Sequence, residues 1–340
     1  MSRTASWANV QEYETKQSVG EPTQLAVRET GVANIGPCHW VFKKTCPDIN
    51  VRFYLYTGTH PDTPEELALG EEGNLTGSSF NPAHPTKIII HGFASDTNLV
   101  HLVKIRTGYL STGPHNIVAV DWSHYSKGPW FCYPVSVANI PHTGQCVAQL
   151  IEALRVAGSE DIHLVGFSLG AHVPAFTANY MRPYQIPRIT GLDPAMPLFA
   201  SRSKDSKLDA GDALFVDVVH TNAFIQGKFE RCGHVDFYMN GGVSQPGCYS
   251  DGDYLECNHH RAPAYFAESI TTRRGFWGWR CDGFFWYLLG MCPPRYPPLL
   301  MGAHTDNSIR GYYIVETSSQ SPYALGKWTG PDVKLVAEIP

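Results

Sequence analysis

The sequence predicts an α/β fold, in which helices cover both faces of a mostly parallel β-sheet. Between residues 51 and 220, short apolar runs of strand length alternate with segments whose apolar residues recur at helical spacing. Several of these runs are apolar at nearly every position, which is typical of parallel strands that are buried on both faces. The 340 residues are 43% hydrophobic and 17% charged, so the chain can bury the core that this fold requires.

The expected strands and helices follow one another regularly along the chain. The run at 51–56 alternates between apolar and polar residues like a strand, whereas 61–85 is rich in Pro, Gly, Glu and Asn and is expected to be loop. Further strands are expected at 86–91, 116–121, 161–165, 188–193 and 213–220, with helices at 143–156 and 171–181.

The chain is expected to contain one folded domain. Residues 1–36 are polar and unpatterned, which predicts a mobile extension, and 37–340 is expected to be the domain because no linker or repeat divides it. Lys and Arg number 26 against 31 Asp and Glu and form no basic stripe, which argues against binding of nucleic acid. No apolar run reaches the length of a membrane span.

The nine cysteines point to disulfide bonds. They contain no Cys-x-x-Cys pair, so they lack the spacing of a zinc site. Pairing within short loops leaves Cys232 over and gives the bonds Cys38/Cys46, Cys132/Cys146, Cys248/Cys257 and Cys281/Cys292. Such bonds require an oxidising compartment, so we expect secretion although residues 1–36 contain no apolar segment of signal-peptide type. The alternative is that all nine are reduced core residues.

The candidate nucleophile is a serine flanked by glycines. Ser168 lies in Gly166-Phe-Ser-Leu-Gly170, directly after an expected strand and before an expected helix. In such a turn the glycines avoid clashes with the neighbouring strand and helix. The turn also places Ser168 near a helix N-terminus, which favours negative charge that develops there. The alternative is a glycine-rich turn that contains an incidental serine.

A nucleophilic serine requires a base and an acid that orients the base. Asp193 follows the strand expected at 188–193, and the C-terminal edge of an open α/β sheet is where active sites lie. Spacing alone does not select the base among the later histidines, which are His220, His234, His259, His260 and His304.

Several motifs together resemble the neutral lipase family of pancreatic lipase, and most of all its insect branch, which includes phospholipases A1. The two longest are Val165-Gly-Phe-Ser-Leu-Gly-Ala-His172 and Thr190-Gly-Leu-Asp-Pro-Ala195. Shorter motifs match in the same order: His91-Gly-Phe93, Val120-Asp-Trp122, Val216-Asp-Val-Val-His-Thr221, Gly233-His-Val-Asp-Phe237, Asn240-Gly-Gly242 and Cys257-Asn-His259. The resemblance covers about Cys38 to Lys327 and implies the α/β-hydrolase fold.

The resemblance also implies roles for individual residues. Ser168 resembles the nucleophile, Asp193 the acid and His259 the base, because His259 completes the Cys-Asn-His motif. The backbone N–H groups of Phe93 and Leu169 resemble the oxyanion hole, as expected for the residue after the nucleophile and a loop after an early strand.

A second segment resembles the structural calcium site of this family. Its ligands would be the carboxylates of Asp209 and Asp212 and the carbonyl oxygens of Lys204 and Lys207, which are hard oxygen donors of the kind that calcium prefers. The alternative is a solvated loop of mixed charges.

The function expected from these features is hydrolysis of lipid acyl esters through an acyl-enzyme, as phospholipase A1, lipase or both, with lipid at a membrane or aggregate surface as substrate. The chemistry needs no cofactor. Because the resemblance includes no C-terminal β-sandwich domain, colipase is not expected as a partner. The alternatives are a lipid-binding relative of the yolk-protein type, with weak or no catalysis, and an esterase for soluble substrates.

Two further segments bear on the substrate. Cys248 and Cys257 enclose only eight residues, too few for a long amphipathic lid, which predicts a preference for phospholipid over triglyceride. The segment Gly275–Cys292 is dense in aromatic residues and is expected either to rest on a lipid interface or to pack in the core beneath a disulfide.

Overall fold

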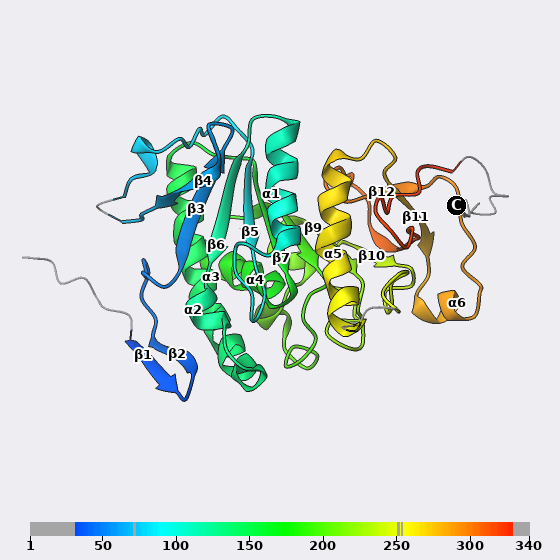
Figure 1. Cartoon of the computed structure of the whole chain (residues 1–340), viewed down its shortest axis with the longest axis horizontal. Helices are drawn as coiled ribbons and strands as arrows, with labels where there is room; N and C mark the ends of the chain where they lie inside the picture. The colour runs from blue at the N-terminus through cyan, green and yellow to red at the C-terminus, as the bar shows by residue number, and fades with distance from the viewer. Residues whose placement is uncertain (1–30, 71–72, 250–251, 253, 329–340) are drawn as a thin grey trace, which may run out of the picture.

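A computed structural model describes residues 31–328, apart from 71–72, 250–251 and 253 (Figure 1). Its centre is an 11-stranded sheet in the order β12-β11-β13-β10-β9-β8-β7-β5-β6-β3-β4. The middle of the sheet, from β6 through β13, is parallel, and two antiparallel strands extend it at each end. The strands are β3 (Arg52–Thr57), β4 (His60–Leu67), β5 (Thr86–Ile90), β6 (Asn116–Asp121), β7 (Ile162–Phe167), β8 (Ile186–Leu192), β9 (Ala213–His220), β10 (Val235–Met239), β11 (Phe276–Cys281), β12 (Leu299–Met301) and β13 (Gly311–Val315).

Helices cover both faces of this sheet, as the sequence predicts. On one face α1 (Val100–Thr112) packs against α5 (Tyr254–Thr271), and on the other α3 (Tyr133–Val156) packs against α4 (Val173–Met181) (Figure 1). Each pair seals its own buried apolar cluster against the sheet. Two shorter helices are α2 (Ser123–Ser126), whose Tyr125 belongs to the same buried cluster as α3, and α6 (Phe284–Leu288). Among the described helices, none is both long and apolar enough to cross a membrane.

The strands expected in the parallel part of the sheet are confirmed as β5–β9, and the alternating run at 51–56 is β3. The loop expected at 61–85 is wrong at its start, because β4 covers His60–Leu67. This strand lies at the edge of the sheet, where Pro61 and Pro64 cost fewer ladder hydrogen bonds than they would inside it.

The helix expected at 143–156 is ten residues longer at its N-terminus. Pro141 lies inside α3, and a proline normally marks a helix boundary because it removes one backbone hydrogen bond. The helix continues through it because Val137 and Ile140 before the proline and Val147 after it all belong to one buried cluster.

The extension expected at residues 1–36 is wrong at its C-terminal end. Strand β1 (Gly31–Ile35) pairs with β2 (Cys38–Lys43) in a small antiparallel sheet. Gly36 joins them with a φ of 61°, a conformation that glycine adopts without steric cost. The remainder of the expected extension, residues 1–30, lies outside the described residues.

All eight cysteines expected in disulfides are bonded, but two of the four pairings are wrong. The bonds Cys248–Cys257 and Cys281–Cys292 are as predicted, whereas the others are Cys38–Cys132 and Cys46–Cys146. The longer α3 explains the difference, because about 20 Å of helix separates residues 132 and 146. The segment around β2 lies along α3 instead, so that each of its cysteines meets one cysteine of the helix region.

Cys232 is the free cysteine of the described chain, as predicted. Burial raises the pKa of its thiol, which keeps the group protonated and unreactive.

Candidate active site

Ser168 lies in a sharp turn between β7 and the 3-10 helix Ser168–His172, with a φ of 56°. This left-handed conformation is uncommon outside glycine, and an active-site turn is one place where such strain is found. A Cβ on Gly166 would lie 2.4 Å from the carbonyl oxygen of Gly170, and one on Gly170 would lie 2.3 Å from that of His91. The two flanking glycines therefore permit the close contact of strand and helix that holds the serine.

Asp193 follows β8 at the same edge of the sheet and is fully buried. Its Oδ1 accepts hydrogen bonds from the backbone N–H groups of Thr221 (2.8 Å) and Asn222 (3.1 Å), which follow the end of β9. A Cβ on Gly227 would lie 2.4 Å from the same oxygen, so only glycine leaves room for this carboxylate. The other oxygen, Oδ2, is thereby directed toward His259.

His259 lies near the N-terminus of α5, and its Nδ1–H donates to Asp193 Oδ2 at 2.6 Å. The hydroxyl of Thr221 donates to the carbonyl of His259, and the ring of Phe167 lies 4.7 Å from the imidazole. The next residue, His260, instead lies 3.7 Å from the carboxylate of Glu256. The structure thus brings His259, rather than its neighbour, together with Asp193.

Ser168 and His259 line one open cavity of about 530 Å³. Its wall is mostly apolar and includes Phe93, Leu99, Trp130, Tyr133, Pro197 and Leu255. Such a site has room for an apolar group beside the serine and the imidazole.

Of the two residues expected to form the oxyanion hole, Leu169 follows Ser168 in the chain and Phe93 lines the same cavity. Leu169 is in the first turn of the 3-10 helix, where backbone N–H groups have no partner inside the helix. Phe93 follows Gly92 after β5, and a Cβ on Gly92 would lie only 2.8 Å from the Cβ of Ser168. The loop that carries Phe93 is anchored on its other side, where the N–H of Ala94 donates to Ser126.

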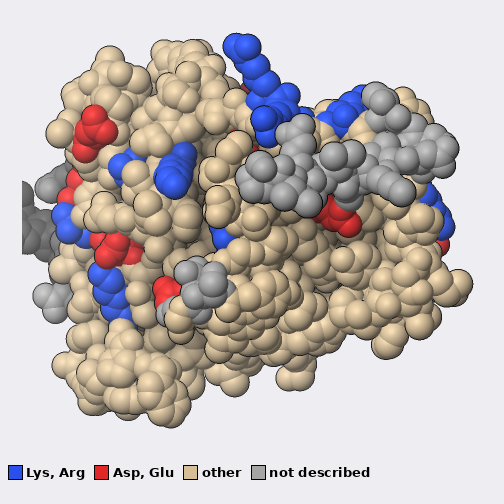
Figure 2. Space-filling view, turned by 45° about the vertical axis from the view of Figure 1, so that its right-hand side comes forward, with Lys and Arg blue, Asp and Glu red and all other residues tan. Residues whose placement is uncertain are grey.

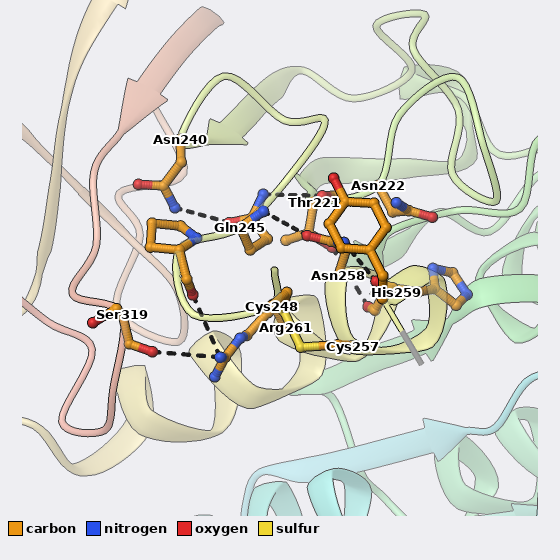
Figure 3. The surroundings of a disulfide bond; sticks show 12 residues. Thr221, Asn222, Asn240, Gln245, Cys248, Cys257, Asn258, His259, Arg261 and Ser319 are labelled. Carbon is orange, nitrogen blue, oxygen red and sulfur yellow. Dashed lines mark hydrogen bonds between the residues drawn. A yellow bond between two sulfur atoms is a disulfide. The ribbon is translucent and has the colours of Figure 1, made fainter. Parts of the chain in front are cut away.

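The disulfide Cys248–Cys257 is surrounded by a buried polar network that the sequence did not reveal (Figure 3). Gln245 is fully buried, and its Nε2 donates to the carbonyl of Thr221 at 2.9 Å. The backbone N–H of Gln245 donates to Asn258 Oδ1 at 2.5 Å. Gln245 therefore connects the residue that binds Asp193 with the residue that precedes His259.

Sequence reasoning included Thr221 and Asn258 in family motifs without assigning them a role, and it missed Asn222 and Gln245. Thr221 and Asn222 follow β9, so their place at the carboxyl edge of a parallel sheet was a usable signal. Gln245 and Asn258 lie in irregular chain and in a helix, and only the folded structure brings them together (Figure 3).

The histidines that spacing left open have other partners. His220 contacts Asp236 at 3.0 Å, His234 accepts a hydrogen bond from the backbone of Val216, and His304 lies 3.1 Å from the carbonyl of Ile270.

The segment expected to bind calcium brings its two aspartates together. The N–H of Asp209 donates to Asp212 Oδ2 at 2.8 Å, and Asp209 Oδ1 accepts from Gly211. Burial and the neighbouring Asp209 raise the pKa of Asp212 to about 7. The side chain of Lys207 is directed elsewhere, toward Ala200 and Glu230, so it does not neutralise the pair.

Comparison with known proteins identifies the family. The model of the lipase family matches residues 39–323. The chain is 32% identical to phospholipase A1 member A of Mus musculus, over 82% of this chain and 64% of the relative. It is 32% identical to pancreatic lipase-related protein 2 of Bos taurus (73% and 57% covered) and 33% identical to pancreatic triacylglycerol lipase of Oryctolagus cuniculus (72% and 57%). The chain thus spans about three fifths of the length of these relatives. Because the family match covers most of the chain, the protein belongs to the lipase family.

Proposed function

We propose that this protein hydrolyses lipid acyl esters with Ser168 as nucleophile, His259 as base and Asp193 as the acid that orients the base. The observation that carries the proposal is the 2.6 Å hydrogen bond from His259 to the buried Asp193, with the serine and the imidazole in one apolar cavity. Membership of the lipase family, whose relatives include proteins named phospholipase A1 and triacylglycerol lipase, also supports it.

In the proposed reaction, Ser168 Oγ attacks the ester carbonyl while Nε2 of His259 takes the hydroxyl proton. The N–H groups of Phe93 and Leu169 bind the oxyanion, and His259 then gives its proton to the departing alcohol. Water, deprotonated by the same imidazole, releases the fatty acid and restores the serine. Asp193 holds the tautomer in which Nδ1 carries hydrogen and stabilises the imidazolium.

We further propose that phospholipid is preferred to triglyceride. The Cys248–Cys257 loop encloses eight residues, and its last three already belong to α5, so little chain remains to cover the cavity. Leu255 and Glu256 both line the cavity, which gives its rim a polar side. A polar, open rim admits a charged head group without the desolvation that an apolar lid would impose.

The test compares fatty-acid release from the sn-1 position of a mixed-acyl phosphatidylcholine with release from a long-chain triglyceride. We expect faster phospholipid hydrolysis at sn-1 and little activation when substrate aggregates. Faster triglyceride turnover, or release mainly from sn-2, would contradict the preference. Two further outcomes match the alternatives: no turnover of any ester would indicate a lipid-binding protein, and turnover of soluble esters alone an esterase.

We propose that Asp209 and Asp212, with the carbonyls of Lys204 and Lys207, hold a structural calcium ion. The donor set consists of hard oxygens, and a divalent charge would stabilise the charged form of the buried Asp212 carboxylate. Bound calcium would stabilise the fold rather than enter the chemistry. A chelator is expected to lower the melting temperature of the purified protein, and Asp212→Asn to remove this dependence, whereas Asp205→Asn, at an exposed neighbour, keeps it. An unchanged melting temperature in chelator would refute the site.

We propose that the protein acts outside the cell, because it contains four disulfides, two of which join residues 94 and 100 positions apart. Non-reducing peptide mapping of protein from cell medium tests the compartment and the bonds. Recovery of only reduced protein from the cytosol would contradict it.

A further inference from the structure

The aromatic segment expected to be either core or lipid contact is divided between the two. Phe276 and Trp279 on β11 are buried in the core. The loop closed by Cys281–Cys292 instead exposes a cluster of large apolar side chains, which we call the α6 patch: Phe285 (76% exposed), Trp286 (47%), Leu288 (63%), Leu289 (69%) and Met291 (55%).

The loop is anchored to the core, while the patch side chains remain exposed. The indole N–H of Trp279 donates to the carbonyl of Cys292 at 2.9 Å, inside the disulfide. Tyr287 packs inward, because a Cβ on Gly241 would lie 2.3 Å from its ring. With Tyr287 and Phe284 turned toward the molecule, the patch residues of α6 remain outside.

The α6 patch has no charge of its own. Residues 283–294 contain no Asp, Glu, Lys or Arg, and the nearest ion pair, Asp282 with Arg295, lies at the base of the loop. Helix α6 is at the lower right of the molecule in Figure 1, and Figure 2, which brings this side forward, shows a broad area at the lower right without charged side chains. Five large apolar side chains exposed together on one loop are unusual on a protein that has no partner there.

Aromatic packing connects the α6 patch with the rim of the active-site cavity. The ring of Phe284 lies 5.5 Å from Phe224 and 5.0 Å from Phe229, which stack on each other at 4.2 Å. Phe224 and Ile225 are exposed, and the next residue, Gln226, lines the cavity. On the rim itself Trp130 is 83% exposed. Apolar side chains therefore extend from the mouth of the cavity to α6.

We propose that the α6 patch inserts into the surface of a zwitterionic phospholipid bilayer and holds the cavity against it. The proposal rests on the proposed function, because a substrate that comes from lipid explains why the apolar surface begins at the cavity. Aromatic and aliphatic side chains without charges suit the boundary between head groups and acyl chains. The lack of Lys and Arg in the loop favours neutral over anionic lipid.

The test measures binding to phosphatidylcholine vesicles by co-sedimentation, in a Ser168→Ala background so that lipid is not consumed. The double variant Phe285→Ser/Leu289→Ser is expected to bind about 100-fold more weakly, on the order of tenfold for each side chain. The control is Val156→Ser, which removes an even more exposed apolar side chain (91%) from the end of α3 and should bind normally. Equal binding by the double variant and the control would overturn the proposal.

Two further measurements distinguish lipid docking from a defect in catalysis. Brominated lipid is expected to quench the tryptophan emission of the protein. The quenching should be weaker in Trp286→Phe, a conservative change at an exposed side chain that should leave the fold intact. With Ser168 intact, the double variant should hydrolyse a soluble short-chain ester at the normal rate while losing vesicle hydrolysis, which distinguishes docking from catalysis. If no ester is hydrolysed at all, the proposed function fails but the binding result still decides the docking. Loss of self-association in sedimentation, with vesicle binding unchanged, would identify a second copy as the occupant and refute lipid docking.

Discussion

At the scale of single residues, the candidate site depends on an unusual backbone conformation at two positions, the nucleophile and the acid. Ser168 and Asp193 both have positive φ, at 56° and 43°, and each follows a buried strand of the parallel sheet. The N–H of Ala195 donates to the carbonyl of Ser168, so the two turns support each other. Such strain persists only where the surrounding packing enforces it, and here glycines provide the packing space.

Gly227→Ala is expected to lower turnover by roughly 100-fold or more, because the added Cβ would overlap the Asp193 carboxylate and displace it from His259. Gly227 is not in the left-handed region, so backbone strain adds nothing to this effect. Gly58→Ala is the matched control, since nothing lies within 4 Å of its added Cβ. Steady-state kinetics with a soluble ester and a melting curve are measured for both variants. Normal kcat in Gly227→Ala would show that the position of Asp193 is not critical.

His259→Gln is expected to abolish turnover by several orders of magnitude, whereas His260→Gln is expected to retain it within about tenfold. Adjacent residues of a helix are about 100° apart around its axis, so only one of the two can meet Asp193. The kcat of each variant on one soluble ester gives the comparison. An equal loss in both, or a larger one in His260→Gln, would reassign the base.

The sequence predicts those site residues that come directly after a strand. Ser168 and Asp193 could be placed because each comes directly after an apolar run, and parallel strands end at one edge. The base could not be placed by spacing, because His259 is 66 residues from its acid and lies on a helix that bears polar residues at most exposed positions. A family resemblance selected it, and the hydrogen bond to Asp193 supports the same residue.

At the scale of elements, the sequence identified β3 and the parallel strands β5–β9 of the large sheet, and it missed β4 and the four strands from β10 to β13. β12 is only three residues long, and β10 carries the buried Asp236 within its apolar run, so neither has a clear pattern. Helix α5 contains Pro263 and a polar first half, which hides its periodicity. Pro141 hid the first ten residues of α3 in the same way. The pairing of Cys132 with Cys146 rested on their short spacing in the sequence, and the full length of this helix keeps the two residues apart.

The contact between α3 and the N-terminal segment also contains a buried polar cluster. Asp48 Oδ2 accepts from the hydroxyl of Tyr125 at 2.6 Å and lies 2.6 Å from His142 Nε2. Burial alone would raise the pKa of Asp48, but the hydrogen bonds from His142, Tyr125 and Asn50 outweigh it and lower the pKa below 3.8. The carboxylate therefore stabilises the fold above pH 3.8, and this contribution is lost as the pH falls through the lowered pKa.

Asp48→Asn is expected to reduce the free energy of unfolding by about 2–3 kcal/mol at pH 7, because buried donors lose a charged acceptor. The reduction should persist at pH 5 and shrink below pH 3.8, where the unfolded-state carboxyl becomes protonated. Denaturant unfolding at pH 7, 5 and 3, with disulfides intact, measures it. A difference that is constant across this range would mean that the charge of Asp48 contributes nothing.

At the scale of the whole molecule, the proposed catalytic site and the proposed docking surface are both supported by buried apolar clusters of one fold. Two apolar clusters, one on each face of the sheet, fix the strand ends that carry Ser168 and Asp193. A third, smaller cluster around Tyr238 and Tyr312 supports β11 and the loop that bears α6. Association with lipid would therefore act through side chains that the packed core supports.

The whole-molecule charge leads to a last prediction about salt. The formal net charge is −5 and the α6 patch is uncharged, so binding to zwitterionic vesicles should have almost no electrostatic component. Hydrolysis of phosphatidylcholine vesicles is expected to change by less than about twofold between 0.01 and 0.15 M salt, over which the screening length falls from about 30 to about 8 Å. Vesicles that also contain phosphatidylglycerol should be hydrolysed more slowly at low salt, because their negative charge repels the protein. Added salt should reduce the difference in rate between the two vesicle types. Initial rates on both vesicle types, with a soluble ester as the control for direct salt effects, measure this. Faster attack on the anionic vesicles at low salt would instead show that a basic surface, and not the α6 patch, guides the protein to lipid.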